Sequence, residues 1–127
     1  MTTLLDASAV LAVINEESGA ENVEKALDDA AISTVNAAEV VSKLDDFGWP
    51  TDEIAPLFKH LQLEILPFEM DAALTSGHLR SATRKLGLSL GDRACLATAL
   101  LTKYRILTAD KSWAKLKIRG VSIKCIR

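Results

Sequence analysis

Four acidic residues occupy similar positions along the chain. They are Asp6, Glu39, Asp92 and Asp110, and each lies at or near the expected start of a helix. Three of them follow a short apolar run, directly or nearly so, that we expect to be a strand. In an open parallel sheet the carboxyl ends of the strands meet at one edge, where ligands bind. The four carboxylates are therefore expected to converge although they are far apart in the sequence.

A cluster of four carboxylates predicts a divalent cation. Close carboxylates repel one another and desolvation disfavours their charged form, so a cation is needed to neutralise them. Ligands that are all oxygen, without His or Cys, favour Mg²⁺ or Mn²⁺ over Zn²⁺. Such ions activate a water and hold a phosphodiester without a side-chain nucleophile. The two histidines, His60 and His78, lie away from the acidic motifs, and we interpret them as ordinary surface or partly buried residues.

Each acid also has a purely structural interpretation as a helix cap. Asp is a preferred N-cap residue, and acids suit the first turn of a helix. The segments from Asn36 to Glu39 and from Ser89 to Asp92 both have the spacing of a capping box. Glu39 also falls away from the apolar stripe of its helix, as a surface cap would. Singly, each acid is better explained as a cap, so the metal hypothesis depends on their convergence.

The elements that must position these acids alternate along the chain. Strands are expected at residues 2–6, 31–35, 63–68, 105–110 and 121–126, and helices at 7–17, 18–30, 36–48, 51–61, 69–87, 90–103 and 111–116. Ser18 is the expected N-cap of the second helix, and Pro56 must bend or shorten the fourth. Short continuous apolar strands indicate a parallel sheet covered on both faces. The 127 residues contain no repeat or linker and predict one α/β domain.

The composition excludes several classes of protein. Hydrophobic residues make up 49% and charged residues 25%, an ordinary globular balance. The longest apolar run, residues 9–14, is too short to span a membrane. The N-terminus lacks a basic region and Asp6 interrupts its apolar stretch, so we expect no signal peptide. Two cysteines, Cys95 and Cys125, are too few for a disulfide scaffold and indicate a reduced, cytoplasmic protein.

Charge is distributed unevenly along the chain. Twelve of the 15 Lys and Arg residues fall in residues 80–127, together with only two of the 17 acids. A basic segment of this kind favours a polyanionic partner. Acidic and basic elements that alternate in space and merely keep the surface soluble would explain the same asymmetry, so the sequence leaves both interpretations open.

Four segments carry a resemblance that covers the whole chain. They are LLDASAV with Asp6, STVNAAEV with Glu39, LSLGDRACLATAL with Asp92 and ILTADKSW with Asp110. Together, and in this order, they resemble the PIN-domain ribonucleases and, more closely, the VapC toxins of bacterial type II toxin–antitoxin modules. The stretch LSLGDRACLA is the most specific of them. The resemblance implies a single PIN-like domain over residues 1–127, with a central parallel sheet between two layers of helices.

The resemblance also implies an activity and partners. The activity is endonucleolytic cleavage of structured RNA, commonly a transfer RNA or a ribosomal RNA loop, with Mg²⁺ or Mn²⁺. Asp6, Asp92 and Asp110 would hold the metal, the first two most directly, and Glu39 would complete the catalytic set. The implied partners are a VapB-type antitoxin, whose tail covers the site, and a second copy of the chain in a homodimer.

Residues around the acids have expected supporting roles. Ser8 matches a small hydroxyl position that supports the site in the resembling family, and Asn36 and Thr108 would act similarly. We expect Arg93 to pair with a nearby acid and orient it, in preference to contacting a phosphate. The candidate phosphate contacts are Arg80, Arg84, Lys85, Lys111, Lys115 and Lys117, each of which a solvated surface explains better when taken alone. Trp49 and Trp113 could stack on bases, although a core or dimer-interface role explains both better.

Other functions are less consistent with the sequence. A phosphatase of the haloacid dehalogenase type needs a second Asp two residues after the first, where this chain has Ser8. A phosphotransfer receiver needs an acid pair near the first strand and a Lys late in the sheet, which are not evident. A catalytically silent PIN-like module that binds RNA or protein is the main alternative. The intact set of four acids argues against it.

Overall fold

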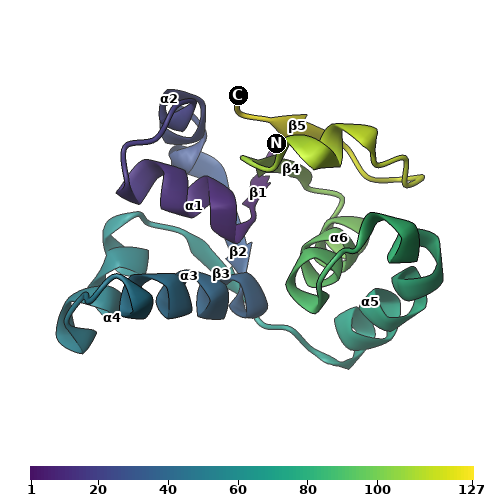
Figure 1. The fold of residues 1–127 in the computed structure, drawn as a ribbon, viewed down its shortest axis with the longest axis horizontal. Coiled ribbons are helices and arrows are strands. Elements are labelled where there is room, and N and C mark those ends of the chain that lie inside the picture. The colour runs from purple at the N-terminus through teal and green to yellow at the C-terminus, as the bar shows by residue number, and fades with distance from the viewer.

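A computed structural model describes residues 1–127 and contains one five-stranded sheet between helices (Figure 1). In spatial order the strands are β3 (Glu64–Leu66), β2 (Ala30–Ser33), β1 (Thr3–Leu5), β4 (Arg105–Thr108) and β5 (Ile123–Cys125). All neighbouring strands are parallel. The predicted α/β fold with a central parallel sheet is confirmed.

Helices cover both faces of the sheet. They are α1 (Ala7–Ile14), α2 (Ala20–Glu24), α3 (Thr34–Asp46), α4 (Thr51–His60), α5 (Met70–Thr83) and α6 (Leu90–Thr102), with 3-10 turns η1 (Leu27–Asp29), η2 (Arg84–Leu86) and η3 (Lys111–Lys115). Helices α1 to α4 lie on one side of the sheet, and α5 and α6 lie on the other (Figure 1). The arrangement has the three layers that the resemblance implied.

Alternate strand residues face two separate cores. Leu5, Ile32 and Leu107 pack with residues of α1, α3 and α4 in one core. Their chain neighbours Leu4, Ala31 and Ile106 pack with α6 and with residues of η3 in the other. Successive side chains of a strand point to opposite faces, so a strand covered on both sides is apolar throughout. This explains the continuous apolar runs from which the strands were predicted.

Several helix boundaries differ from the prediction. The helix expected at residues 7–17 ends at Ile14, and the one expected at 69–87 ends at Thr83 and is followed by η2. The helix expected at residues 18–30 is split into α2 and η1, and Gly19, not Ser18, precedes it. Gly19 has φ of +90°, and a Cβ there would lie 2.5 Å from the carbonyl oxygen of Ile126, so only glycine fits. Helix α3 begins at Thr34 because the Ser33 hydroxyl accepts a hydrogen bond from the Asn36 N–H at 3.2 Å and caps it.

Some smaller expectations are also resolved. Helix α4 runs through Pro56 to His60, so the proline does not shorten it. Cys95 is buried in α6, Cys125 is partly buried, and both thiols are free. None of the helices is both long enough and apolar enough to cross a membrane.

Candidate active site

The four predicted acids lie in one cavity of about 360 Å³. The residues that line it are Asp6, Ala7, Ser8, Leu11, Asn36, Glu39, Ser42, Lys43, Asp46, Asp92 and Asp110. Asp6 directly follows β1, and Asp110 follows the neighbouring strand β4 by two residues. The order of the strands reverses at β1, and ligands of open α/β sheets bind at such a switch point. The predicted convergence of the acids is therefore observed.

Asp6 is the most buried of these acids. One carboxylate oxygen, Oδ1, accepts hydrogen bonds from the Ala9 N–H at 2.9 Å and from the Ser8 hydroxyl at 2.7 Å. The other, Oδ2, accepts one from the Thr108 hydroxyl at 2.5 Å. Desolvation by burial raises the pKa of Asp6, the hydrogen bonds oppose that rise, and the charge of Asp92 adds to it. Asp6 is thus both the N-cap of α1 and part of the cavity wall.

Ser8 and Thr108 tie the ends of β1 and β4 together. The Ser8 hydroxyl accepts a hydrogen bond from the Ala109 N–H at 2.9 Å, and the Thr108 hydroxyl accepts one from the Asp110 N–H at 3.1 Å. The two hydroxyl oxygens lie 3.2 Å apart. Asp110 itself caps η3 by accepting hydrogen bonds from the N–H and hydroxyl of Ser112 at 2.9 and 2.6 Å. The two hydroxyls therefore position both acids.

Asn36 connects Glu39 to helix α6. Its buried amide donates to Glu39 Oε1 at 2.6 Å and to the Gly91 carbonyl at 3.1 Å. Desolvation raises the pKa of Glu39, the bond from Asn36 lowers it, and the charge of Asp92 raises it further. Because α3 begins at Thr34, residues 36 and 39 do not form a capping box, and that interpretation of Glu39 is wrong.

Gly91 is a site residue that the sequence reasoning did not select. A Cβ built on it would lie 2.5 Å from Cδ and 2.6 Å from Oε1 of Glu39. The missing side chain therefore makes room for the Glu39 carboxylate. The available signal was the position of a glycine in the first turn of a helix, where it lowers helix stability and needs a packing or functional reason.

Asp92 both caps helix α6 and contributes to the cavity. Asp92 Oδ2 accepts a hydrogen bond from the Ser89 N–H at 3.0 Å, and the Ser89 hydroxyl accepts one from the Asp92 N–H, so the predicted capping box is formed. Asp92 nevertheless lines the cavity.

Arg93 donates to the Ser76 carbonyl at 3.1 Å and makes no ion pair. The expected pairing of Arg93 with a site acid is wrong, because the side chain is directed to α5.

The PIN domain family model matches residues 3–118 of the chain. The chain belongs to the PIN domain family. Solved structures that resemble it include VapBC2 from Rickettsia felis bound to a promoter DNA fragment, at 19% identity and a TM-score of 0.76, with 98% of each chain covered. VapBC-5 from Mycobacterium tuberculosis has 26% identity, a TM-score of 0.64 and 96% of each chain covered.

A third similar structure is a toxin–antitoxin complex from Klebsiella pneumoniae. It has 25% identity and a TM-score of 0.71, and the alignment covers 94% of this chain and 95% of that one. Among curated proteins, none matches this PIN domain in sequence. The fold is thus shared over nearly the full length with chains of toxin–antitoxin complexes.

The donor set of this PIN domain has the chemistry of a site for a hard cation. All the acids that line the cavity offer oxygen ligands, and the buried carboxylate of Asp6 makes no ion pair. No three of the acidic, His or Cys side chains are close enough to enclose a metal by themselves. Mg²⁺ usually keeps several waters and is held through one or two carboxylates, so a closed cage is not required. The residues therefore fit Mg²⁺ or Mn²⁺ bound partly through water.

The predicted phosphate contacts lie outside this cavity. Arg80, Arg84 and Lys111 are exposed, and none of them is among the residues that line it. The one basic side chain that does line it is Lys43, which the sequence analysis did not select. The sequence feature that could have identified Lys43 is its position four residues after Glu39, which places both side chains on one face of α3.

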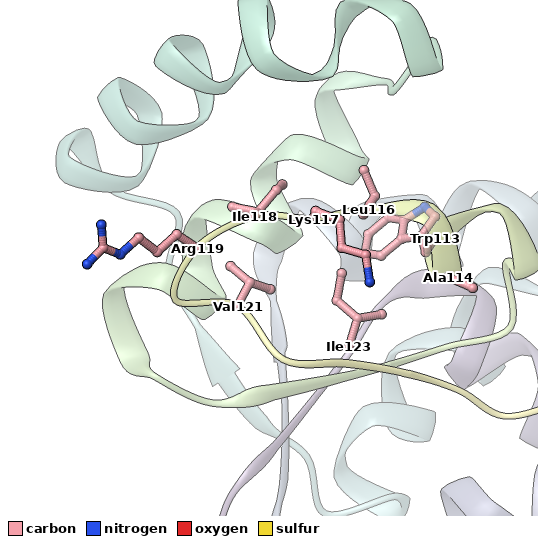
Figure 2. Close-up of a pocket in the computed structure, with 8 residues that line it drawn as sticks. All are labelled: Trp113, Ala114, Leu116, Lys117, Ile118, Arg119, Val121 and Ile123. Atoms are coloured by element: carbon pink, nitrogen blue, oxygen red, sulfur yellow. The ribbon is translucent and has the colours of Figure 1, made fainter.

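Trp113 and Lys117, both candidates for RNA contact from the sequence, line a second pocket of about 540 Å³, which Figure 2 shows in close-up. It is lined by Trp113, Ala114, Leu116, Lys117, Ile118, Arg119, Val121 and Ile123. Trp113 is only 1% exposed and belongs to the core beside α6, so base stacking by it is excluded. Trp49 is half-buried against the other core. The core interpretation is confirmed for Trp113, whereas Trp49 packs against the core with part of its side chain exposed.

Proposed function

We propose that this PIN domain is a Mg²⁺- or Mn²⁺-dependent endoribonuclease and the toxin of a VapBC type II toxin–antitoxin module. The observation that carries the proposal is the convergence of Asp6, Glu39, Asp92 and Asp110 in one cavity. The likeness to toxin–antitoxin complexes over nearly the full chain supports the biological role. The intact acid set favours this function over a catalytically silent module that binds RNA or protein.

The chemistry proposed for the site divides between metal and protein. The bound ion would supply an activated water and neutralise the charge on a phosphodiester. Asp6, Asp92 and Asp110 would hold that ion, and Thr108 and Ser8 would keep Asp6 oriented through their hydrogen bonds. Glu39 is the remaining predicted acid of the cavity, and the hydrogen bond from Asn36 orients its carboxylate. We assign Glu39 the role of accepting a proton in the reaction.

The proposed partners follow from the similar structures. Two of them are VapBC assemblies and a third is a toxin–antitoxin complex, so we propose a VapB-type antitoxin for this chain. We propose structured RNA, such as transfer or ribosomal RNA, as the substrate, the cytoplasm as its place of action, and a homodimer as the assembly. The uneven distribution of basic residues is consistent with a polyanionic substrate.

Induced expression in bacteria tests the function. The wild-type chain is expressed beside Asp6→Ala, growth is followed, and RNA from both cultures is mapped for new 5′ ends. Growth arrest and discrete new ends with the wild type alone are the expected result, and the ends identify the cleaved RNA. Folded wild-type protein that binds Mn²⁺ but gives neither arrest nor new ends would favour the silent binding module.

A further inference from the structure

The acidic cavity contains one positively charged side chain, and the proposed function does not yet use it. Lys43 lies on α3, four residues after Glu39 and three before Asp46. These spacings place the three side chains on one face of the helix, and all three line the cavity. Lys43 is thus the one cation among five carboxylates, counting Asp46 with the four predicted acids.

The ammonium group of Lys43 is not neutralised by these acids. The chain has two ion pairs, from Arg127 to Glu17 and from the N-terminus to Asp29, and neither involves Lys43. The exposed side chain is therefore free to bind an anion.

Electrostatic repulsion would oppose the entry of an RNA strand into this cavity. Its phosphates would be repelled by the carboxylates, whose charge a bound metal ion would neutralise only in part. Binding of a nucleic acid is supported mainly by lysine and arginine contacts to phosphates. The expected contacts Arg80, Arg84 and Lys111 do not line the cavity, so Lys43 is the cation placed to make a contact inside it. A lysine on its flexible stem acts as a compact point charge that can reach a phosphate without a fixed geometry.

We propose that Lys43 binds a backbone phosphate of the RNA that the acidic cavity accepts. The inference rests on the proposed function for the identity of the ligand. Lys43 would then position the strand over the acids without taking part in the bond cleavage. Its place in the last turn of α3 also lets it interact with the helix dipole, and the test must separate this structural effect from RNA binding.

Binding measurements in a non-cleaving background make that separation. Asp6→Asn protein is titrated with fluorescein-labelled oligouridine and Mg²⁺ over a series of KCl concentrations, alone and combined with Lys43→Ala, Lys43→Arg or Lys59→Ala. Each phosphate contact to a single strand contributes about 0.7 to the slope of log affinity against log salt concentration. Lys43→Ala is expected to weaken binding and to reduce this slope by about 0.7, while Lys43→Arg preserves it. Lys59 is exposed on α4 outside the acidic cavity, so its replacement should change neither quantity.

The outcomes distinguish this inference from the proposed function. If Lys43→Ala matches Lys59→Ala in slope and affinity, or if the parent protein does not bind oligouridine, the inference is overturned. A fall in thermal stability or in Mn²⁺ affinity at unchanged salt slope would assign Lys43 a structural or charge-balancing role instead. If the slope falls as expected but the protein with Asp6 intact cleaves no RNA, Lys43 is a phosphate contact and the nuclease assignment alone is lost.

Discussion

The carboxylate of Glu39 fills the space that a side chain on Gly91 would need. Cδ of Glu39 would lie 2.5 Å from a Cβ built on Gly91. The same glycine presents its carbonyl oxygen to Asn36, which also binds Glu39. The first turn of α6 and the middle of α3 are therefore fitted to each other at the site, and this relationship can be tested directly.

Gly91→Ala is expected to lower the rate of RNA cleavage strongly. Alanine stabilises a helix by about 1 kcal/mol relative to glycine, but its methyl group would displace the Glu39 carboxylate from Asn36. Initial cleavage rates and urea unfolding measure the two effects. Gly77→Ala is the control, since a Cβ there meets open space on α5. It should raise the free energy of unfolding by about 0.5–1 kcal/mol without changing the rate. Equal behaviour of the two variants would contradict the proposed contact.

Asp92→Asn is expected to abolish metal-dependent cleavage while the fold is kept or slightly stabilised. The charge of Asp92 raises the pKa of both Asp6 and Glu39, so its removal relieves repulsion inside the cavity. The amide oxygen can still accept the hydrogen bond from the Ser89 N–H that closes the capping box. Cleavage with Mn²⁺ and thermal unfolding with a chelator check the two parts. Purified Asp92→Asn protein that cleaves at the wild-type rate would refute the mechanism.

Thr108→Val is expected to move the acid limb of the pH–rate profile to higher pH. The Thr108 hydroxyl donates to Asp6 and lowers its pKa against the effect of burial, so the pKa rises when the hydroxyl is lost. The unfolding free energy should fall by about 1–3 kcal/mol, because a buried oxygen loses a partner. Profiles of kcat/KM against pH provide the measurement. Thr102→Val removes a hydroxyl that donates to the Thr98 carbonyl and accepts from the Tyr104 N–H at the end of α6, away from the acids, and it should leave the limb in place.

Asp6→Asn should reveal the energetic effect of burying a carboxylate. The folded protein raises the pKa of Asp6 and so binds its proton more tightly than the unfolded chain. The free energy of unfolding contributed by Asp6 therefore falls as pH rises from the ordinary Asp pKa through the raised one. Without metal, the Asn variant should gain stability relative to the wild type over that range, and the gain should vanish in acid. Urea unfolding of both proteins at several pH values measures this difference in stability. A stability gain of the Asn variant found only in acid would contradict the prediction.

Arg93→Met is expected to retain cleavage and to lose stability. Arg93 donates to the Ser76 carbonyl and thereby joins α6 to α5, away from the acids. Loss of this hydrogen bond should lower the free energy of unfolding by about 1–3 kcal/mol. Cleavage rates and urea unfolding of the same preparation test the assignment. A variant of unchanged stability that no longer cleaves would restore a direct role for Arg93 at the site.

Local sequence signals predicted most of the elements, and they failed where a distant contact decides the structure. Helix α6 was predicted correctly from its apolar run and its Ser89 cap, both of which are local. Helix α2 begins after Gly19, not after Ser18, where the chain passes close to the Ile126 carbonyl, more than one hundred residues away in the sequence. Arg93 was assigned to an acid because Asp92 adjoins it in sequence, whereas its partner is a backbone carbonyl of α5.

The sequence by itself determined the strand and helix order and the four acids, because apolar periodicity and residues at element boundaries are local properties. It also implied that Asp6, Glu39, Asp92 and Asp110 would meet, since parallel strands align their carboxyl ends. Only the tertiary structure decided which neighbours complete the cavity. Lys43 lines the cavity, and Gly91 makes room in it for the Glu39 carboxylate, because α3 packs against α6. That packing depends on contacts between segments that are far apart in the sequence.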